Sequence, residues 1–198
     1  MANIWFVRSN GDTVHNDPST PDYVPDEPPE FPKVECNYRL KCLKQGFARI
    51  GWPNTGDLTL ETPVRLAPNG YSIHNLESRY LGYLYSFSGI LAGDLILIPA
   101  DQDRGDVHLG IALTVKGEKI PPYINPRPKA YYYYHNISKG DWYECAHRVN
   151  VLWACTNQDD YSIFHVKAVE DIIWIYAFSQ VIDTNGAIYQ MAQKAKLF

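Results

Sequence analysis

The stretch GDLILIPADQDRGDVHLGIALTV, residues 93–115, decides the fold. Its first part, Gly93–Ala100, is short and almost continuously apolar, which predicts a strand buried on both faces. A polar turn, DQDRG, joins it to a second apolar run at Gly105–Val115. Because so short a turn brings consecutive strands side by side, the sequence predicts a buried pair of neighbouring strands.

Four more segments are rich in aromatic and β-branched residues, which predicts further strands. They are NIWFVRS at 3–9, FARIGW at 47–52, KAYYYYHNI at 129–137 and WYECAHRVNVLWA at 142–154. In the last segment, strand alternation predicts one face carrying Cys145, His147, Val149, Val151 and Trp153.

Helical spacing of apolar residues marks most of the remaining sequence. It predicts helices over 34–45, over 76–89, and in the C-terminal third over 165–182 and 187–195. The expected fold class is therefore α+β, with a curved, barrel-like mixed sheet flanked by helices. The chain of 198 residues suits a single domain, 1–198, with a helical C-terminal extension at about 156–198.

Charge is unevenly distributed along the chain, whose formal net charge is −4. A proline-rich acidic loop at 11–32 has six prolines and six acids, which predicts an extended surface loop. Two stretches are basic, one at 33–49 and one at 116–129. Aromatic residues make up 14% of the chain, a density that suits either a core or a surface on which bases stack.

The start, MANIWFVRSN, lacks the pattern of a signal peptide, and no apolar run reaches 18 residues. The sequence therefore favours a cytoplasmic protein without a membrane segment. Its four cysteines form no C-x-x-C pair, which favours free buried thiols, and neither a metal nor another cofactor is expected.

An enzyme is not favoured, because the sequence holds no G-x-S-x-G, P-loop, G-x-G-x-x-G or H-E-x-x-H motif. His108 and His147 lie on strands that could be neighbours, and Cys145 precedes His147 on the same face, so a small enzyme using Cys145 and His147 remains an alternative. The carboxylates at 101–106 lie in one turn and do not converge as those of a metal nuclease do.

The order of four motifs resembles the EVE-like domains of the PUA-like superfamily. The motifs are IWFVRSNG, GFARIGWPNTGDL, GDLILIPADQDRGDVHLGIAL and YECAHRVNVLW. The chain looks most similar to the N-terminal modified-base-binding domains of Mrr-like and McrB-like modification-dependent restriction systems, over residues 3–154. The resemblance implies a curved sheet with a pocket at one end, where aromatic rings hold a modified base flipped out of nucleic acid.

Candidate nucleic-acid-binding residues follow from the strand ends and turns that match. Trp52, between a glycine and a proline at a strand end, is a pocket wall or a core plug, whereas Trp5 is more typical of a core. Arg8 is the strand-end arginine of the resemblance, and Asp101 could accept a hydrogen bond from a base amino group. The full set is Trp52, Arg8, Ser9, Trp5, Asn10, Trp142, Tyr143, Asp101, His147 and Arg148.

The expected function is a nucleic-acid-binding module that recognises a modified, methylated base in DNA by flipping it into an aromatic pocket, in a restriction or defence context. No catalysis is expected from this chain alone, so cleavage would come from a nuclease or NTPase partner polypeptide. An RNA-binding factor in RNA modification or processing is the alternative within nucleic-acid binding.

Overall fold

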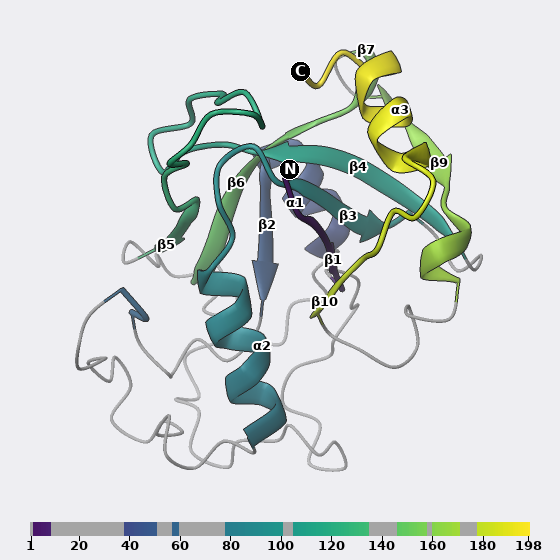
Figure 1. Ribbon diagram of the computed structural model, residues 1–198. Coiled ribbons are helices and arrows are strands. Elements are labelled where there is room, and N and C mark those ends of the chain that lie inside the picture. The colour runs from purple at the N-terminus through teal and green to yellow at the C-terminus, as the bar shows by residue number, and fades with distance from the viewer. Residues whose placement is uncertain are drawn as a thin grey trace.

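The computed structural model describes residues 2–8, 38–50, 57–59, 78–100, 105–134, 146–157, 160–170 and 178–198, without the side chains of 38 and 78–81. Figure 1 shows a strongly curled sheet with helices packed around it. The α+β fold class predicted from the sequence is confirmed.

In chain order the elements are β1 Ile4–Val7, α1 Tyr38–Gln45, β2 Phe47–Ile50, α2 Ser78–Ser88, β3 Leu95–Pro99, β4 Asp106–Ala112, β5 Tyr131–Tyr133, β6 His147–Trp153, β7 Cys155–Asn157, β8 Asp160–Tyr161, β9 Ile163–His165, a 3₁₀ turn at Lys167–Val169, β10 Phe178–Gln180 and α3 Ala187–Lys194.

Eight strands of the described chain form one mixed sheet whose main path runs β10-β1-β3-β4-β6-β2. The pair β1–β3 is parallel, and the other pairs along this path are antiparallel. Strand β5 pairs with β6, and β9 pairs with β4. The predicted hairpin at 93–115 is confirmed, with Leu97 opposite Leu109 in the middle of the β3–β4 pair.

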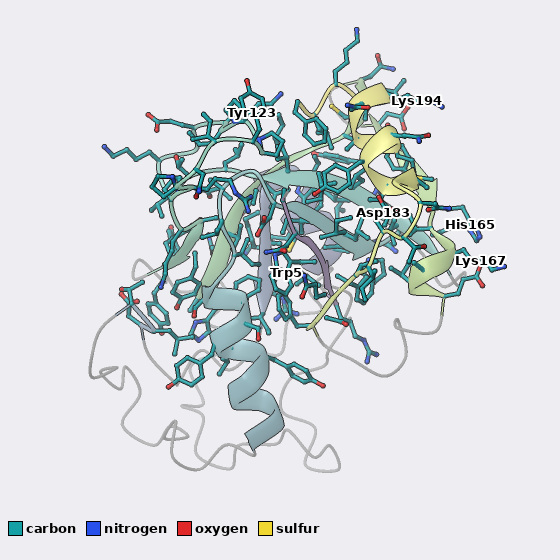
Figure 2. The ribbon with its side chains drawn as sticks, in the orientation of Figure 1. Trp5, Tyr123, His165, Lys167, Asp183 and Lys194 are labelled. Atoms are coloured by element: carbon teal, nitrogen blue, oxygen red, sulfur yellow. The ribbon has the colours of Figure 1, made fainter. Side chains whose placement is uncertain are left out.

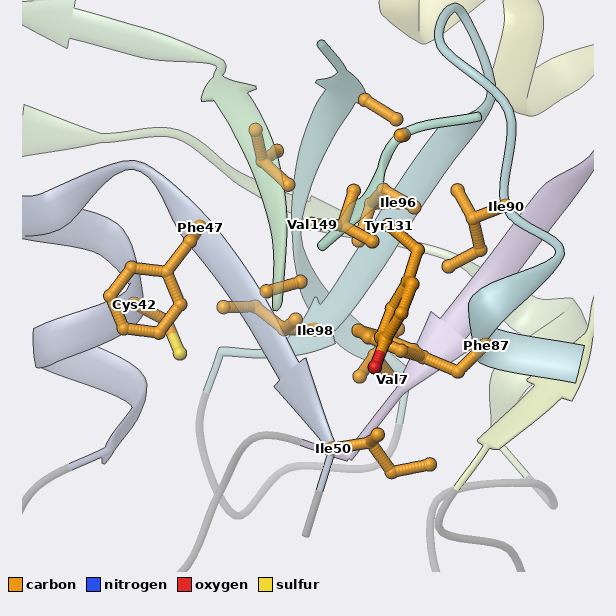
Figure 3. Packing of buried hydrophobic residues seen from close by; sticks show 14 of the residues in the cluster. Val7, Cys42, Phe47, Ile50, Phe87, Ile90, Ile96, Ile98, Tyr131 and Val149 are labelled. Carbon is orange, nitrogen blue, oxygen red and sulfur yellow. The ribbon is translucent and has the colours of Figure 1, made fainter. Parts of the chain in front are cut away.

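The sheet curls around one of two hydrophobic cores. Val7 of β1 and Ile50 of β2 share that inner core, although β1 and β2 stand far apart along the path of the sheet. Figure 3 shows the two strands converging there, with α1 beside β2, and Phe87 of α2 belongs to the same core. The described sheet is therefore a half-barrel, with side chains from both ends of its path meeting inside.

The outer core lies on the opposite face of β1, β3 and β4. Alternation along β3 sends Ile96 and Ile98 inward, whereas Leu95 and Leu97 face outward. Helix α3 covers these outward residues with Ile188 and the rest of its apolar side. Because both faces of the central strands are covered, the sequence of β3 is a continuous apolar run.

The prediction of helix over 165–182 is wrong for the described residues of that range, 165–170 and 178–182, so the described part of the C-terminal extension at 156–198 is helical only in part. The described portion includes β9, a 3₁₀ turn and β10, and only the helix predicted at 187–195 is confirmed, as α3. The reason is tertiary, since Phe178 pairs with Val7 and Trp5 pairs with Gln180 across β1 and β10. Strand pairing with a distant segment overrides the local apolar spacing.

The acidic loop at 11–32 lies outside the described residues. Among the described residues, no helix is long and apolar enough to cross a membrane. Of the cysteines expected to be free and buried, Cys42 is buried and Cys155 is exposed, both as free thiols. The expectation of burial is therefore wrong for Cys155, which lies in the short β7–β8 hairpin at the surface.

Candidate nucleic-acid interface

A row of aromatic rings crosses the inside of the half-barrel. Trp5 stacks on Phe178 with ring centroids 5.1 Å apart, and Phe178 meets Phe87 edge to face at 5.7 Å. The row continues from Phe87 to Tyr131 at 6.2 Å and from Tyr131 to His147 at 6.0 Å. We call these five residues the aromatic row. They come from β1, β10, α2, β5 and β6, so the curling of the sheet is what assembles them.

Tyr131 and His147 form the end of this row and are joined by a hydrogen bond. Tyr131 Oη lies 2.9 Å from His147 Nδ1, and both side chains are buried. The Tyr131 hydroxyl also accepts the Leu58 amide at 3.3 Å. Burial raises the pKa of Tyr131, which keeps its proton available. The Tyr131 hydroxyl is therefore able to donate to Nδ1 of His147.

Two described residues on either side of 51–56, Ile50 and Leu58, lie next to this pair. Ile50, the last residue of β2, lies opposite His147, the first residue of β6. Leu58, the second residue of the described range 57–59, donates its amide to Tyr131. Two hydrogen bonds from Thr59 to the Asp57 side chain, at 2.9 and 2.7 Å, stabilise the turn there.

Arg148 lies on the opposite face of β6 from His147, as alternation predicts. Its guanidinium carbon sits 4.4 Å from the centroid of the Phe47 ring and 3.9 Å from that of the Tyr134 ring. Across the strands it is paired with Arg49, and both arginines are buried. This position gives Arg148 cation–π contacts and places it apart from the aromatic row.

Asp94 fixes the other end of the aromatic row. Its buried carboxylate accepts the Trp5 indole N–H at 2.9 Å and the Asn3 and Leu91 amides at 2.9 and 3.1 Å. Arg127 completes the set with an ion pair of 2.6 Å to the same carboxylate. The contacts of Trp5 therefore support a structural role, as its sequence context favoured.

Four of the ten sequence-predicted site residues lie in the described chain. The structure brings Trp5 and His147 into one aromatic row and places Arg148 on the other face of β6. Arg8 is exposed and directly follows β1. The other candidates, and the Cys145 of the enzyme alternative, lie outside the described residues: Trp52, Ser9, Asn10, Asp101, Trp142 and Tyr143.

His108 and His147 lie on paired strands, but the register keeps them apart. The pairing of β4 with β6 starts at Gly110, which lies opposite Trp153. His108 precedes this paired stretch and lies opposite Ile163 of β9. There His108 Nδ1 lies 3.2 Å from the Ser162 carbonyl oxygen, and burial lowers the pKa of this histidine. Among the described residues, no group of three or more His, Cys, Asp or Glu side chains could hold a metal ion.

Sequence reasoning did not select four residues that build the site: Tyr131, Phe87, Phe178 and Asp94. Tyr131 was one of four consecutive tyrosines, and alternation alone does not say which of two faces turns inward. Asp94 carried a signal that could have been used, because an acid at the start of a fully apolar strand is buried only with partners.

Three comparisons with known proteins found nothing similar. No family model matches the chain, and no curated protein and no solved structure matches it.

Proposed function

We propose that this chain is a nucleic-acid-binding module of EVE-like type that recognises a modified, methylated base in DNA after the base has flipped out of the duplex. The supporting observation is the anchoring of the segment around Trp52. Its flanks meet the Tyr131–His147 pair, Ile50 by strand pairing and Leu58 by its amide. Trp52 follows Ile50 by two residues and itself lies outside the described chain.

The buried rings of Tyr131 and His147 would support the wall of such a pocket from inside the core. Tyr131 and His147 are too buried to stack on a base themselves. Their hydrogen bond and ring contacts hold the ends of the neighbouring segments, and a ring presented on a fixed support loses less entropy on binding. Trp52 is the proposed base-stacking ring on this support, and the exposed Arg8 is the proposed phosphate contact.

Stacking and methyl burial set the size of the expected effects. Stacking one base on an aromatic ring contributes about 1 to 3 kcal/mol. Burying one methyl group adds about 0.8 kcal/mol, which is roughly a fourfold preference for the methylated form. A stronger preference requires a polar group that recognises the base edge or a clash with the unmodified base.

The test is a titration of the full chain with labelled oligonucleotides of one sequence, with and without a methylated base, prepared as DNA and as RNA. We expect tighter binding to methylated DNA, loss of that preference in Trp52→Ala, and its retention in Trp52→Phe. Tyr85→Ala, which removes an exposed ring of α2, is the matched control. Equal binding of methylated and unmodified oligonucleotides would overturn the proposal, and a preference confined to RNA would move the function to RNA processing.

The small-enzyme alternative receives less support from the described residues. His147 is fully buried, and its Nδ1 is occupied by Tyr131, so this nitrogen does not face a substrate. Cys145→Ser tests the alternative directly, since a dyad enzyme would lose its turnover. We propose instead that any cleavage of the bound DNA comes from a separate nuclease or NTPase polypeptide.

A further inference from the structure

A second surface is basic and presents exposed lysines that take no part in the aromatic row. It comprises the connection between β4 and β5, residues 113–130, and the end of α3 with the turn after it, residues 194–198. We call it the distal basic surface. Its exposed lysines are Lys116, Lys119, Lys129, Lys194 and Lys196, and Glu118 is the one acid in these two segments.

The two segments of the distal basic surface touch each other. Lys119 Nζ lies 3.5 Å from the carbonyl oxygen of Lys196, so these two lysines, distant in sequence, lie close together. Tyr123 and Lys194 both lie on the upper rim of the molecule in Figure 2, at the end of the half-barrel opposite α2. A local excess of positive charge on a chain of net charge −4 suits an anionic partner.

A tyrosine stands out from this surface. Tyr123 is 84% exposed, and its neighbour Ile124 is 42% exposed. A tyrosine presented to solvent among lysines combines a stacking platform with charges that neutralise phosphates. This pairing of chemistries fits a nucleic acid whose bases are accessible.

The connection that carries Tyr123 is held firmly to the sheet. The Asn150 side-chain amide donates to the carbonyl oxygens of Thr114 and Val115 at 3.3 and 3.0 Å. At its other end, Arg127 is ion-paired with the buried Asp94, and the Ala92 amide donates to the Pro128 carbonyl. The distal basic surface is therefore preorganised, which reduces the entropy lost on binding.

We propose that the distal basic surface binds single-stranded nucleic acid, with Tyr123 stacking on a base and the lysines contacting phosphates. This contact is independent of the base pocket proposed above, because it requires no modified base. It would hold a strand that leaves the pocket region or a separate single-stranded segment of the same nucleic acid.

The experiment measures the affinity of the full chain for an unmodified, fluorescently labelled oligothymidylate by anisotropy at several salt concentrations. We expect Tyr123→Leu to weaken binding by roughly tenfold, as loss of one base stack implies, and Tyr123→Phe to retain it. Lys119→Gln with Lys196→Gln should reduce the slope of log affinity against log salt by about 0.7 for each phosphate contact removed.

The matched control is Lys44→Gln with Lys167→Gln, which makes the same change in net charge at two exposed lysines of α1 and the 3₁₀ turn. Equal losses in the two double variants would overturn the proposal, since the effect would then be one of net charge. Unchanged binding in Tyr123→Leu would also overturn it. So would capture of the chain by vesicles of anionic phospholipid in place of the oligonucleotide. Because the probe has no modified base, failure here leaves the pocket titration unaffected.

Discussion

Tyr131 and His147 share a hydrogen bond of 2.9 Å inside the half-barrel, and this bond joins β5 to β6 through side chains as well as through the backbone. The Leu58 amide adds a third group to the pair. The Tyr131 hydroxyl therefore links β5 and β6 to the described residues 57–59, which follow β2 in the sequence.

Tyr131→Phe should destabilise the protein by about 1 to 3 kcal/mol. The variant keeps the ring but leaves the buried His147 Nδ1 without its hydroxyl partner and removes the acceptor of the Leu58 amide. Denaturant unfolding followed by circular dichroism measures the loss. Tyr85→Phe, at an exposed position of α2, should unfold like the parent chain. Equal stability of the two variants would show that the hydroxyl contributes nothing.

Asp94→Asn should cost about 3 to 5 kcal/mol, because it leaves Arg127 facing a buried neutral amide. The substitution also weakens the acceptor of the Trp5 indole N–H. The free energy of unfolding measures the effect, and Asp160→Asn, at an exposed position of β8, is the control with the same chemistry. A loss below 1 kcal/mol would mean that the carboxylate does not organise this end of the row.

Gly110→Ala should destabilise the sheet by about 1 to 3 kcal/mol. A Cβ atom there would lie 2.4 Å from Val151 Cγ1 and 2.7 Å from Trp153 Cε3. Adding Val151→Ala should recover part of the loss, which a double-mutant cycle measures.

Gly82→Ala is the matched control for Gly110→Ala, since nothing lies within 4 Å of the added Cβ. In the interior of α2 it should stabilise the protein by up to about 1 kcal/mol. If Gly110→Ala stabilised the protein as much as Gly82→Ala does, the result would contradict the close contact between β4 and β6 at Gly110.

His165 should titrate above its ordinary pKa of 6.5. Its Nδ1 lies 3.0 Å from Asp106 and its Nε2 lies 3.1 Å from Glu170, so hydrogen bonds to the two carboxylates favour the protonated ring. Because the folded-state pKa is raised, this contribution to stability is fully present below 6.5 and is lost as the pH rises through the folded-state value. An NMR titration of the ring in the parent chain and in Asp106→Asn should show the pKa falling in the variant. Asp160→Asn should leave the titration of His165 unchanged.

His108 should show the opposite behaviour, because burial lowers its pKa. A depressed folded-state pKa gives stability that is present above 6.5 and is lost as the pH falls through the folded-state value. Unfolding midpoints measured from pH 7 downward should fall less steeply in His108→Gln than in the parent chain. Parallel curves would show that this histidine is not linked to folding.

The sequence predicted the elements whose patterns are local. The apolar runs of β3 and β4 and the aromatic strand β1 were identified because a buried strand has a local pattern of apolar residues that is visible in the sequence itself. Segment 165–182 was misassigned because β10 is only three residues long and its partner β1 lies at the other end of the sequence. Spacing within such a short strand resembles one helical turn.

The candidate site was predictable only at its strand ends. His147 was selected from alternation in β6, but its hydrogen bond to Tyr131 depends on the register between β5 and β6. Phe87 joins the row because α2 packs against the inner core, a relationship that the sequence of α2 does not contain. Strand register and helix placement are tertiary properties. A shift of one residue in the β5–β6 register, or in the position of α2, would separate the rings of the aromatic row.

The pairing of β1 with β10 has a consequence for synthesis of the chain. During translation β1 emerges first, whereas both of its partners, β3 and above all β10, are made later. Its edge next to β10 stays open until residues 178–180 have been made, and an open apolar edge is a template for aggregation. Chains cut short before residue 178 should therefore accumulate as insoluble material, because they lack the strand that pairs with this edge of β1.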